Sequence, residues 1–218
     1  MRRINCCIPL FVLFLISSSS FGHLKKIAIG YEKGLSLVSM RGNFVLENLQ
    51  KSKLSFTIGI FFQYNINTNF ALRSNISFER KGFAIGPHSG YDSVGNRASV
   101  KSYSRFDYLC LPILARVSLG KKYRFFINAG PYIGYLVGQA DVTKVNDDKF
   151  IEKHIANFNK ADLGLSGGAG VEIPLKRYVL SFEIRDNFGL SNISKLPVAN
   201  DGSIKTNALN LLIAAHKR

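Results

Sequence analysis

The sequence predicts an all-β fold, an eight-stranded antiparallel up-and-down transmembrane β-barrel, and three observations predict it. The chain begins with an export signal. About eight segments then alternate large apolar residues with small or polar ones, and the connections between them alternate short and long. Without a helix, only a closed sheet satisfies every backbone polar group in lipid. We therefore expect a barrel in the cell outer membrane.

The first 22 residues predict a signal peptide. Two arginines precede a short apolar run from Ile8 to Ile16, and small residues at Ser20 and Gly22 predict cleavage after Gly22. The run is shorter than the roughly 20 apolar residues of a spanning helix, which favours a signal over an anchor. Residues 23–218 are then expected to form one outer-membrane β-barrel domain.

Cysteine usage argues against a disulfide framework. Cys6 and Cys7 lie inside the signal, so the exported chain keeps Cys110 alone. One thiol forms no internal disulfide, and a lone cysteine gives no support to a zinc site. We expect Cys110 to be a buried small hydrophobe, and we expect neither a metal nor a cofactor.

The strands are predicted from alternation, because successive side chains of a strand point to opposite faces. Five segments alternate cleanly, and they cover residues 54–65, 70–80, 161–173, 178–185 and 208–214. Three others are less regular, and they cover residues 26–38, 106–119 and 125–137. Pro112 and Pro131 fall in the last two. Proline donates no ladder hydrogen bond, so these positions are expected at a bulge or near a strand end.

The connections predict which barrel end is which. Tight turns are expected at residues 65–69, 120–123 and 175–177. Long polar loops are expected at residues 40–53, 83–102, 140–160 and 192–205. Strict alternation places the long loops at one end, as in outer-membrane barrels, where they lie outside the cell.

A soluble exported barrel of the lipocalin type is the structural alternative, since it alternates too. Such a barrel has long charged residues on its exterior. Here one face is rich in Phe, Leu, Ile and Tyr, which suits lipid. The other is rich in Gly, Ser and Asn with a few charges, which suits a crowded lumen. The composition favours the membrane reading.

The formal net charge of +15 first suggests a nucleic-acid binder. The basic residues are spread through turns and loops, however, and export disfavours nucleic acid. Outer-membrane lipid with anionic headgroups, or an acidic protein partner, fits better, and a merely solvated basic surface remains open.

Six charged residues are expected to point into the lumen. They are Arg73, Glu79, Arg116, Glu172, Glu183 and Arg185. Because buried charges must be paired, three acids and three arginines predict an interior salt-bridge network. A polar plug in a barrel too narrow for a pore is favoured over a proton or ligand relay.

Signals for catalysis are weak, so we expect no enzyme and assign no catalytic residue. His88 (beside Ser89) and His154 lie in long loops, where a histidine, a serine and an acid could form a lipase-like site. The GxSxG spacing that would support it is missing.

Five motifs, in order, resemble those of a known family. They are Phe78–Gly82, Tyr108–Arg116, Asn128–Leu136, Asp162–Glu172 and Phe182–Ile193. Together they are similar to the strand motifs of PorT-family outer-membrane β-barrel proteins of Bacteroidota. The chain departs from the family at Cys110, where a polar or acidic residue is frequent, and at its His216-Lys217-Arg218 end, which lacks a terminal aromatic.

The resemblance implies an eight-stranded outer-membrane barrel. The founding member of that family is implicated in type IX secretion. We therefore expect a non-enzymatic accessory or scaffold in surface assembly or protein secretion, which contacts partner proteins through its long loops. A ligand or adhesion receptor that uses the same loops is the alternative.

Overall fold

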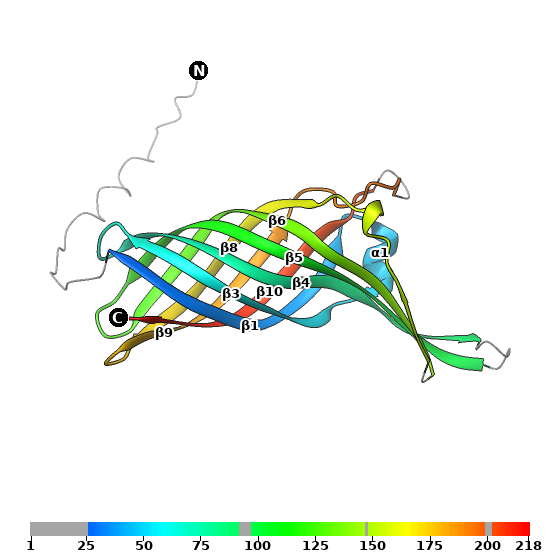
Figure 1. Cartoon of the computed structure of the whole chain (residues 1–218), viewed down its shortest axis with the longest axis horizontal. Coiled ribbons are helices and arrows are strands. Elements are labelled where there is room, and N and C mark those ends of the chain that lie inside the picture. Colours follow the sequence, from blue (N-terminus) through cyan, green and yellow to red (C-terminus); the bar gives the residue numbers. More distant parts are fainter. Residues whose placement is uncertain (1–25, 92–96, 147, 199–201) are drawn as a thin grey trace, which may run out of the picture.

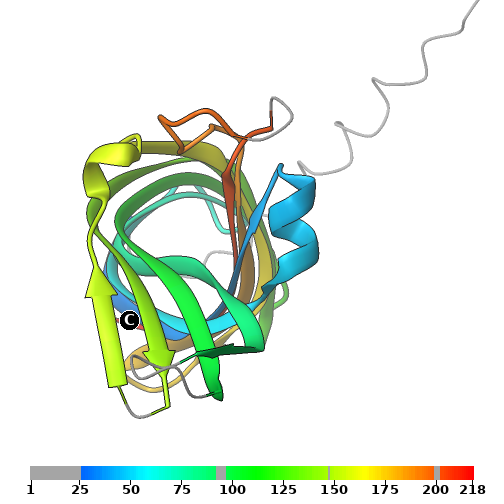
Figure 2. The same cartoon turned by 90° about the vertical axis from the view of Figure 1, so that its right-hand side faces the viewer.

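A computed structural model describes residues 26–91, 97–146, 148–198 and 202–218. The predicted signal peptide and its expected cleavage site lie outside these residues. Eight long strands form a closed wall, seen end-on in Figure 2. They are β1 (Ile27–Arg41), β3 (Lys53–Asn65), β4 (Phe70–Tyr91), β5 (Arg97–Leu119), β6 (Arg124–Val145), β8 (Ala161–Pro174), β9 (Tyr178–Gly189) and β10 (Lys205–Lys217). Each pairs antiparallel with its neighbours, and β1 pairs with β10 to close the ring. The predicted up-and-down barrel is confirmed.

The remaining elements lie at one end of the wall. Two short strands, β2 (Gln50–Lys51) and β7 (Asp148–Glu152), pair with β4 and β6, respectively. The helix α1 (Phe44–Leu49) and a 3₁₀ turn (Ile155–Asn157) accompany them. No helix of the described residues is long and apolar enough to cross a membrane.

Short and long connections lie at opposite ends of the barrel, as predicted. The turns β3–β4, β5–β6 and β8–β9 lie at the left end in Figure 1, with the C-terminus. The long connections lie at the right end. In outer-membrane barrels the short turns face the periplasm, so we name the two ends periplasmic and extracellular.

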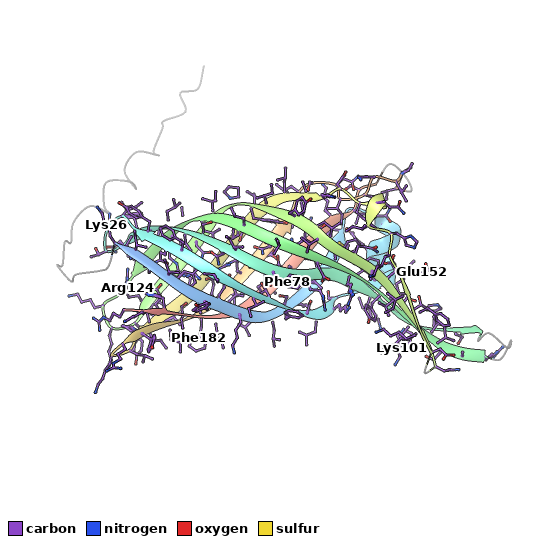
Figure 3. All side chains as sticks on the ribbon, in the orientation of Figure 1. Lys26, Phe78, Lys101, Arg124, Glu152 and Phe182 are labelled. Carbon is purple, nitrogen blue, oxygen red and sulfur yellow. The ribbon has the colours of Figure 1, made fainter. Side chains whose placement is uncertain are left out.

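The extracellular connections contain more regular structure than predicted. The expected loop at residues 83–102 is a hairpin, in which β4 and β5 stay paired as far as Tyr91 and Arg97. β6 follows them to Val145, and β7 pairs with β6. Residues 83–91 of β4, 97–103 of β5 and 141–145 of β6 extend past the wall. Together with β7 they form a four-stranded protruding sheet (Figure 1). Lys101, labelled in Figure 3, lies on it.

The two prolines lie in the middle of the wall, so their predicted position at a bulge or strand end was wrong. Pro112 of β5 pairs with Tyr132, next to Pro131 of β6, and the pairing resumes at Ala115 in the same register. The bulge lies elsewhere, between Asp107 and Tyr108. A proline lacks only the N–H, so the ladder lapses locally without a shift.

The outer face of the wall is apolar over a constant height. Outward-facing residues from Leu54 to Tyr64 on β3, and from Leu109 to Leu119 on β5, are mostly large hydrophobics and exposed. Ten residues of a strand tilted by about 40° rise roughly 26 Å, which matches the apolar band of about 25 Å in outer-membrane barrels. The apolar exterior excludes the soluble binding barrel.

The inner face is mostly polar over the periplasmic part of the wall and apolar toward the extracellular end. There, buried side chains from several strands and a loop pack together, namely Met40, Phe106, Tyr108, Cys110, Leu136 and Ile193. Cys110 is buried, as expected, but its thiol also donates to Glu79 Oε2 at 3.2 Å.

Candidate functional site: the lumen charge network

Charged side chains from six strands meet inside the barrel. We define the lumen charge network as the carboxylates and cations of Glu32, Glu79, Asp162, Glu172, Glu183, Arg73, Lys81, Arg116, Arg124 and Arg185. They come from β1, β4, β5, β6, β8 and β9. Each stands on the inward face of its strand, because alternation turns its sequence neighbours toward lipid.

The centre of the network is Glu32, which binds two arginines from opposite sides. Arg73 Nη2 donates to Glu32 Oε2 at 2.8 Å, and Arg185 Nη1 donates to Glu32 Oε1 at 3.2 Å. Arg185 also donates through Nε to Glu183. The guanidinium of Arg73 lies 3.7 Å from the centre of the Phe61 ring. The glutamate thus ties β4 and β9 to β1.

A second set of contacts extends toward the periplasmic end. Arg116 Nη1 donates to Glu172 Oε1 and to Gln63 Oε1, each at 2.8 Å. Arg116 Nη2 lies 3.6 Å from Glu183 Oε2, which joins this set to the centre. Arg124, labelled near the turn end in Figure 3, lies 3.7 Å from Glu172 Oε2 through Nη1.

A third set lies on the extracellular side and is centred on Lys81. Its Nζ donates to Asp162 Oδ2 at 2.9 Å, and to the hydroxyls of Tyr132 and Thr206 at 3.2 Å each. Glu79 Oε2 lies 3.7 Å from the same Nζ.

Amides complete the shell of Glu79. Asn187 Nδ2 and Asn210 Nδ2 donate to its Oε1 at 3.1 and 2.9 Å, respectively. The carboxylate is therefore bonded from β9 and β10 as well as from β5 through Cys110. Strands that do not pair in the wall are cross-linked through the lumen.

The composition of the network decides its chemistry. Five carboxylates face five cations, so the network as defined is neutral. Arg73, Lys81 and Arg116 are almost fully buried, and a buried charge is tolerated only when it is paired. Their bonds cross the lumen, and the apolar cluster around Phe106 and Leu136 borders the Lys81 set, since Phe106 is the ladder partner of Lys81. This arrangement suits a filled interior better than an ion path.

All six residues that the sequence predicts for the lumen face inward in the structure. Five of them, Arg73, Arg116, Glu172, Glu183 and Arg185, form one chain of ion pairs with Glu32. Glu79 is not part of that chain, since it pairs with Lys81.

Sequence reasoning missed four members of the network, Glu32, Lys81, Asp162 and Arg124. Lys81 lies on the same face as Arg73 and Glu79, so the two-residue period of its strand already indicated an inward cation. Asp162 likewise shares a face with Glu172. Glu32 was harder to assign because Lys33 is a charge on the otherwise apolar face of its strand, whereas the expected interruption at Gly34 was wrong, since the alternation continues through it.

The loop histidines lie far from the lumen charge network, on elements outside the wall. His88 is part of the protruding sheet, and its Nδ1 lies 3.3 Å from the carbonyl oxygen of Gly86. His154 Nε2 lies 3.2 Å from Glu152 Oε2. Among the described residues, neither ring hydrogen-bonds to a serine. In the same part of the chain, no group of three or more His, Cys, Asp or Glu side chains is placed to hold a metal ion.

A comparison with protein families agrees with this architecture. A family model described as outer membrane protein beta-barrel domain matches residues 17–195. A comparison with curated proteins found no match.

Several solved structures are similar to the chain at low identity. The attachment invasion locus protein Ail of Yersinia pestis has 10% identity and a TM-score of 0.41, over 87% of this chain and 97% of that chain. Neisserial surface protein A has 12% identity and a TM-score of 0.44, over 87% and 96%. Outer membrane protein W of E. coli has 15% identity and a TM-score of 0.39, over 88% and 98%.

Proposed function

We propose a function for this chain, which belongs to the outer membrane protein β-barrel family. Its barrel sits in the outer-membrane bilayer. Within that setting, we propose that the protein is a non-enzymatic accessory or scaffold in surface assembly or protein secretion. The wall fixes its position, and the extracellular elements contact partner proteins.

The observation that carries this proposal is the edge of the protruding sheet. β7 pairs with β6 on one side, and no strand of the described residues pairs with its other side. All five of its residues are exposed, including the apolar Phe150 and Ile151. An exposed edge strand with apolar side chains is a template for an added strand of a partner.

The interior supports the same reading. A barrel whose lumen is crossed by ion pairs has its binding surface outside, not inside. The lumen charge network then serves as a neutral brace that holds the wall rigid beneath the protruding sheet. Transport through the barrel has no support in this arrangement.

The resemblance of the five strand motifs to the PorT family suggests which assembly is involved. We propose type IX protein secretion, or the surface assembly that depends on it, in a bacterium of the Bacteroidota. The protruding sheet would bind an extended segment of another component.

A small-ligand receptor is the second candidate, favoured by one cavity. It has a volume of about 200 Å³ and lies in the protruding sheet, lined by Phe83, Ile85, Ser102, Tyr103, Ser104, Asp141, Val142 and Thr143. Aromatic and acidic side chains do converge there. However, Asp141 is already bonded by Ser104 and Gln139, and ligand pockets usually exceed about 300 Å³.

An affinity pull-down of the tagged protein from detergent-solubilised outer membranes tests the proposal. We expect secretion or surface-assembly components to co-purify in stoichiometric amounts. The variant Phe150→Lys/Ile151→Lys should lose them, because two charges on the edge disfavour strand addition. Phe44→Lys, which changes an exposed aromatic of α1 at the same end, is the matched control.

Recovery of the barrel alone, or equal recovery of partners by the edge variant, would contradict the scaffold role at β7. A difference in gel mobility between the unboiled and the boiled sample shows that each variant is folded. Loss of the partner then cannot be due to unfolding of the barrel.

A further inference from the structure

A group of charged residues gathers at the extracellular edge of the wall, where β3, β4 and β5 leave the apolar band. It consists of Lys53, Arg80, Arg105 and Asp107, and we name it the rim cluster. Arg105 and Asp107 are the next two outward positions above Leu109, the last apolar residue of the band on β5. Arg80 lies ten residues above Phe70, or roughly 26 Å at the usual tilt. The cluster is therefore level with the headgroups of the outer leaflet.

The charges of the rim cluster do not balance. Arg80 Nε donates to Asp107 Oδ1 at 2.6 Å, and Arg80 Nη2 donates to Oδ2 at 3.3 Å, so this arginine engages both oxygens of the acid. Lys53 and Arg105 form no salt bridge with any described residue. Lys53 lies close enough to Arg80 and Arg105 for their positive charges to repel its own. The buried Nε of Arg105 has no hydrogen-bond acceptor in the described part of the protein.

The local backbone brings these cations together. Gly82 of β4 has a φ of +143°, a conformation that favours glycine. A Cβ there would lie 2.1 Å from the carbonyl oxygen of Ser104 and 3.2 Å from Cα of Arg105. Lys53 Nζ lies 3.5 Å from the centre of the Tyr103 ring on β5, two strands away. A side chain at position 82 would disturb this close approach.

Aromatic rings fix the height of the cations. Arg80 lies 5.3 Å from the ring centre of Phe56 and 6.0 Å from that of Phe78, which is labelled on the wall in Figure 3. Aromatic residues concentrate at membrane–water interfaces, where they mark the level of the headgroups. Elsewhere at the extracellular end, Arg41 lies over Phe188 and Lys160 over Tyr135.

We propose that the rim cluster binds the phosphate of a phosphorylated lipid of the outer leaflet, with the acyl chains lying along the apolar band beneath. Three cations and one acid leave an excess of two positive charges at the headgroup level. Arginine offers paired N–H donors that match phosphate oxygens, and lysine adds a point charge. The apolar side chains of β3 and β5 directly below suit acyl chains, which a free phosphate lacks. This assignment does not depend on the scaffold role.

The test is a titration of the purified full-length barrel in detergent with bisphosphorylated lipid A, with bound lipid counted by native mass spectrometry. The variant Lys53→Gln/Arg105→Gln leaves the Arg80–Asp107 pair intact. We expect its apparent Kd to rise roughly thirtyfold, since each basic residue near a lipid surface contributes a factor of about five. Lys121→Gln/Lys122→Gln removes the same charge from a periplasmic turn and should bind like the parent.

Two further arms identify the source of the phosphate. Dephosphorylated lipid A should bind weakly to every variant, and inorganic phosphate should bind far more weakly than lipid A. Equal lipid binding by the parent and the rim variant would overturn the proposal, as would an equal loss in the turn variant. Inorganic phosphate that binds as tightly as lipid A would overturn the lipid assignment. If the double variant fails to show heat-modifiable mobility, Arg105→Gln alone is titrated, with an expected weakening of about fivefold.

Discussion

The lumen charge network and the rim cluster use the same side chains in opposite ways. In both, guanidinium groups lie over phenylalanine rings, as Arg73 does over Phe61 inside and Arg80 over Phe56 outside. The lumen charge network matches five carboxylates with five cations, whereas the rim cluster has three cations for one acid. Paired charge inside the wall holds strands together, and unpaired charge at its edge is available to a ligand. Charge balance and burial, rather than residue type, distinguish the lumen charge network from the rim cluster.

The largest expected effect comes from breaking the lumen charge network at Arg185. Arg185→Leu leaves the buried carboxylates of Glu32 and Glu183 with one partner fewer. Removing one member of a buried ion pair costs about 3–5 kcal/mol, so we expect the free energy of unfolding to fall by that amount. Urea unfolding of the protein in lipid vesicles measures it.

Arg177→Leu, at an exposed position in a periplasmic turn, is the matched control. We expect its unfolding free energy to equal that of the parent. A similar loss in both variants would mean that the lumen charge network contributes nothing special.

A second prediction concerns a charge in the apolar band itself. Lys33 of β1 faces outward between Ile58 and Ile213 of the neighbouring strands. A lysine at the middle of the bilayer costs about 2–4 kcal/mol in outer-membrane barrels. Lys33→Leu should therefore stabilise the protein by about 2 kcal/mol in vesicle unfolding.

The reciprocal variant sharpens this prediction. Leu35→Lys, on the same face and two residues away, should destabilise the barrel to a similar extent. If Lys33→Leu instead destabilises the barrel, the lysine has an interaction partner within the membrane. The outer face at Lys33 would then not be in contact with lipid alone.

The rim ion pair should matter much less to stability than its lumen counterparts. The side chain of Arg80 is 29% exposed, so water screens its bond to Asp107. Exposed ion pairs contribute about 0–1 kcal/mol, and Arg80→Gln should cost no more than about 1 kcal/mol. A double-mutant cycle with Asp107→Asn isolates the pair, and a coupling as large as that of a buried pair would contradict the distinction between rim and lumen.

The smallest effect on stability is expected from removing the outer part of the protruding sheet. Ile85 and Ser102 face each other in the ladder, so a two-residue Asn-Gly turn can join them. The wall is complete below this point, and the unfolding free energy should change by less than about 0.5 kcal/mol. A large loss would show that the protruding sheet helps to hold the barrel closed.

The sequence predicted the wall well because lipid imposes a strict rule on it. Nearly every outward position in the band is apolar, with Lys33 as an exception, so the faces of β3 and β9 were separable from alternation alone. The same rule placed all six predicted charges inside. Lys81 and Asp162 followed the same period and were predictable, whereas Glu32 was obscured by the outward-facing Lys33 next to it.

The protruding sheet was missed for the converse reason. It lies beyond the apolar band, so lipid imposes no apolar face on its strands, and residues 83–102 were indistinguishable from a polar loop. Its pairing comes from continued ladders of β4, β5 and β6, which are tertiary contacts. Similarly, nothing local in the sequence shows that Pro112 and Pro131 would lie side by side within the wall.

The central claim is that ion pairs fill and seal the lumen, so that the protein acts from its outer surfaces. Conductance of the purified barrel in a planar lipid bilayer tests it most directly. The account predicts no stepwise current from the parent protein, although gel mobility shows it to be folded and inserted. A stable open channel of constant conductance would contradict the account, because it would require a continuous water path through the lumen charge network.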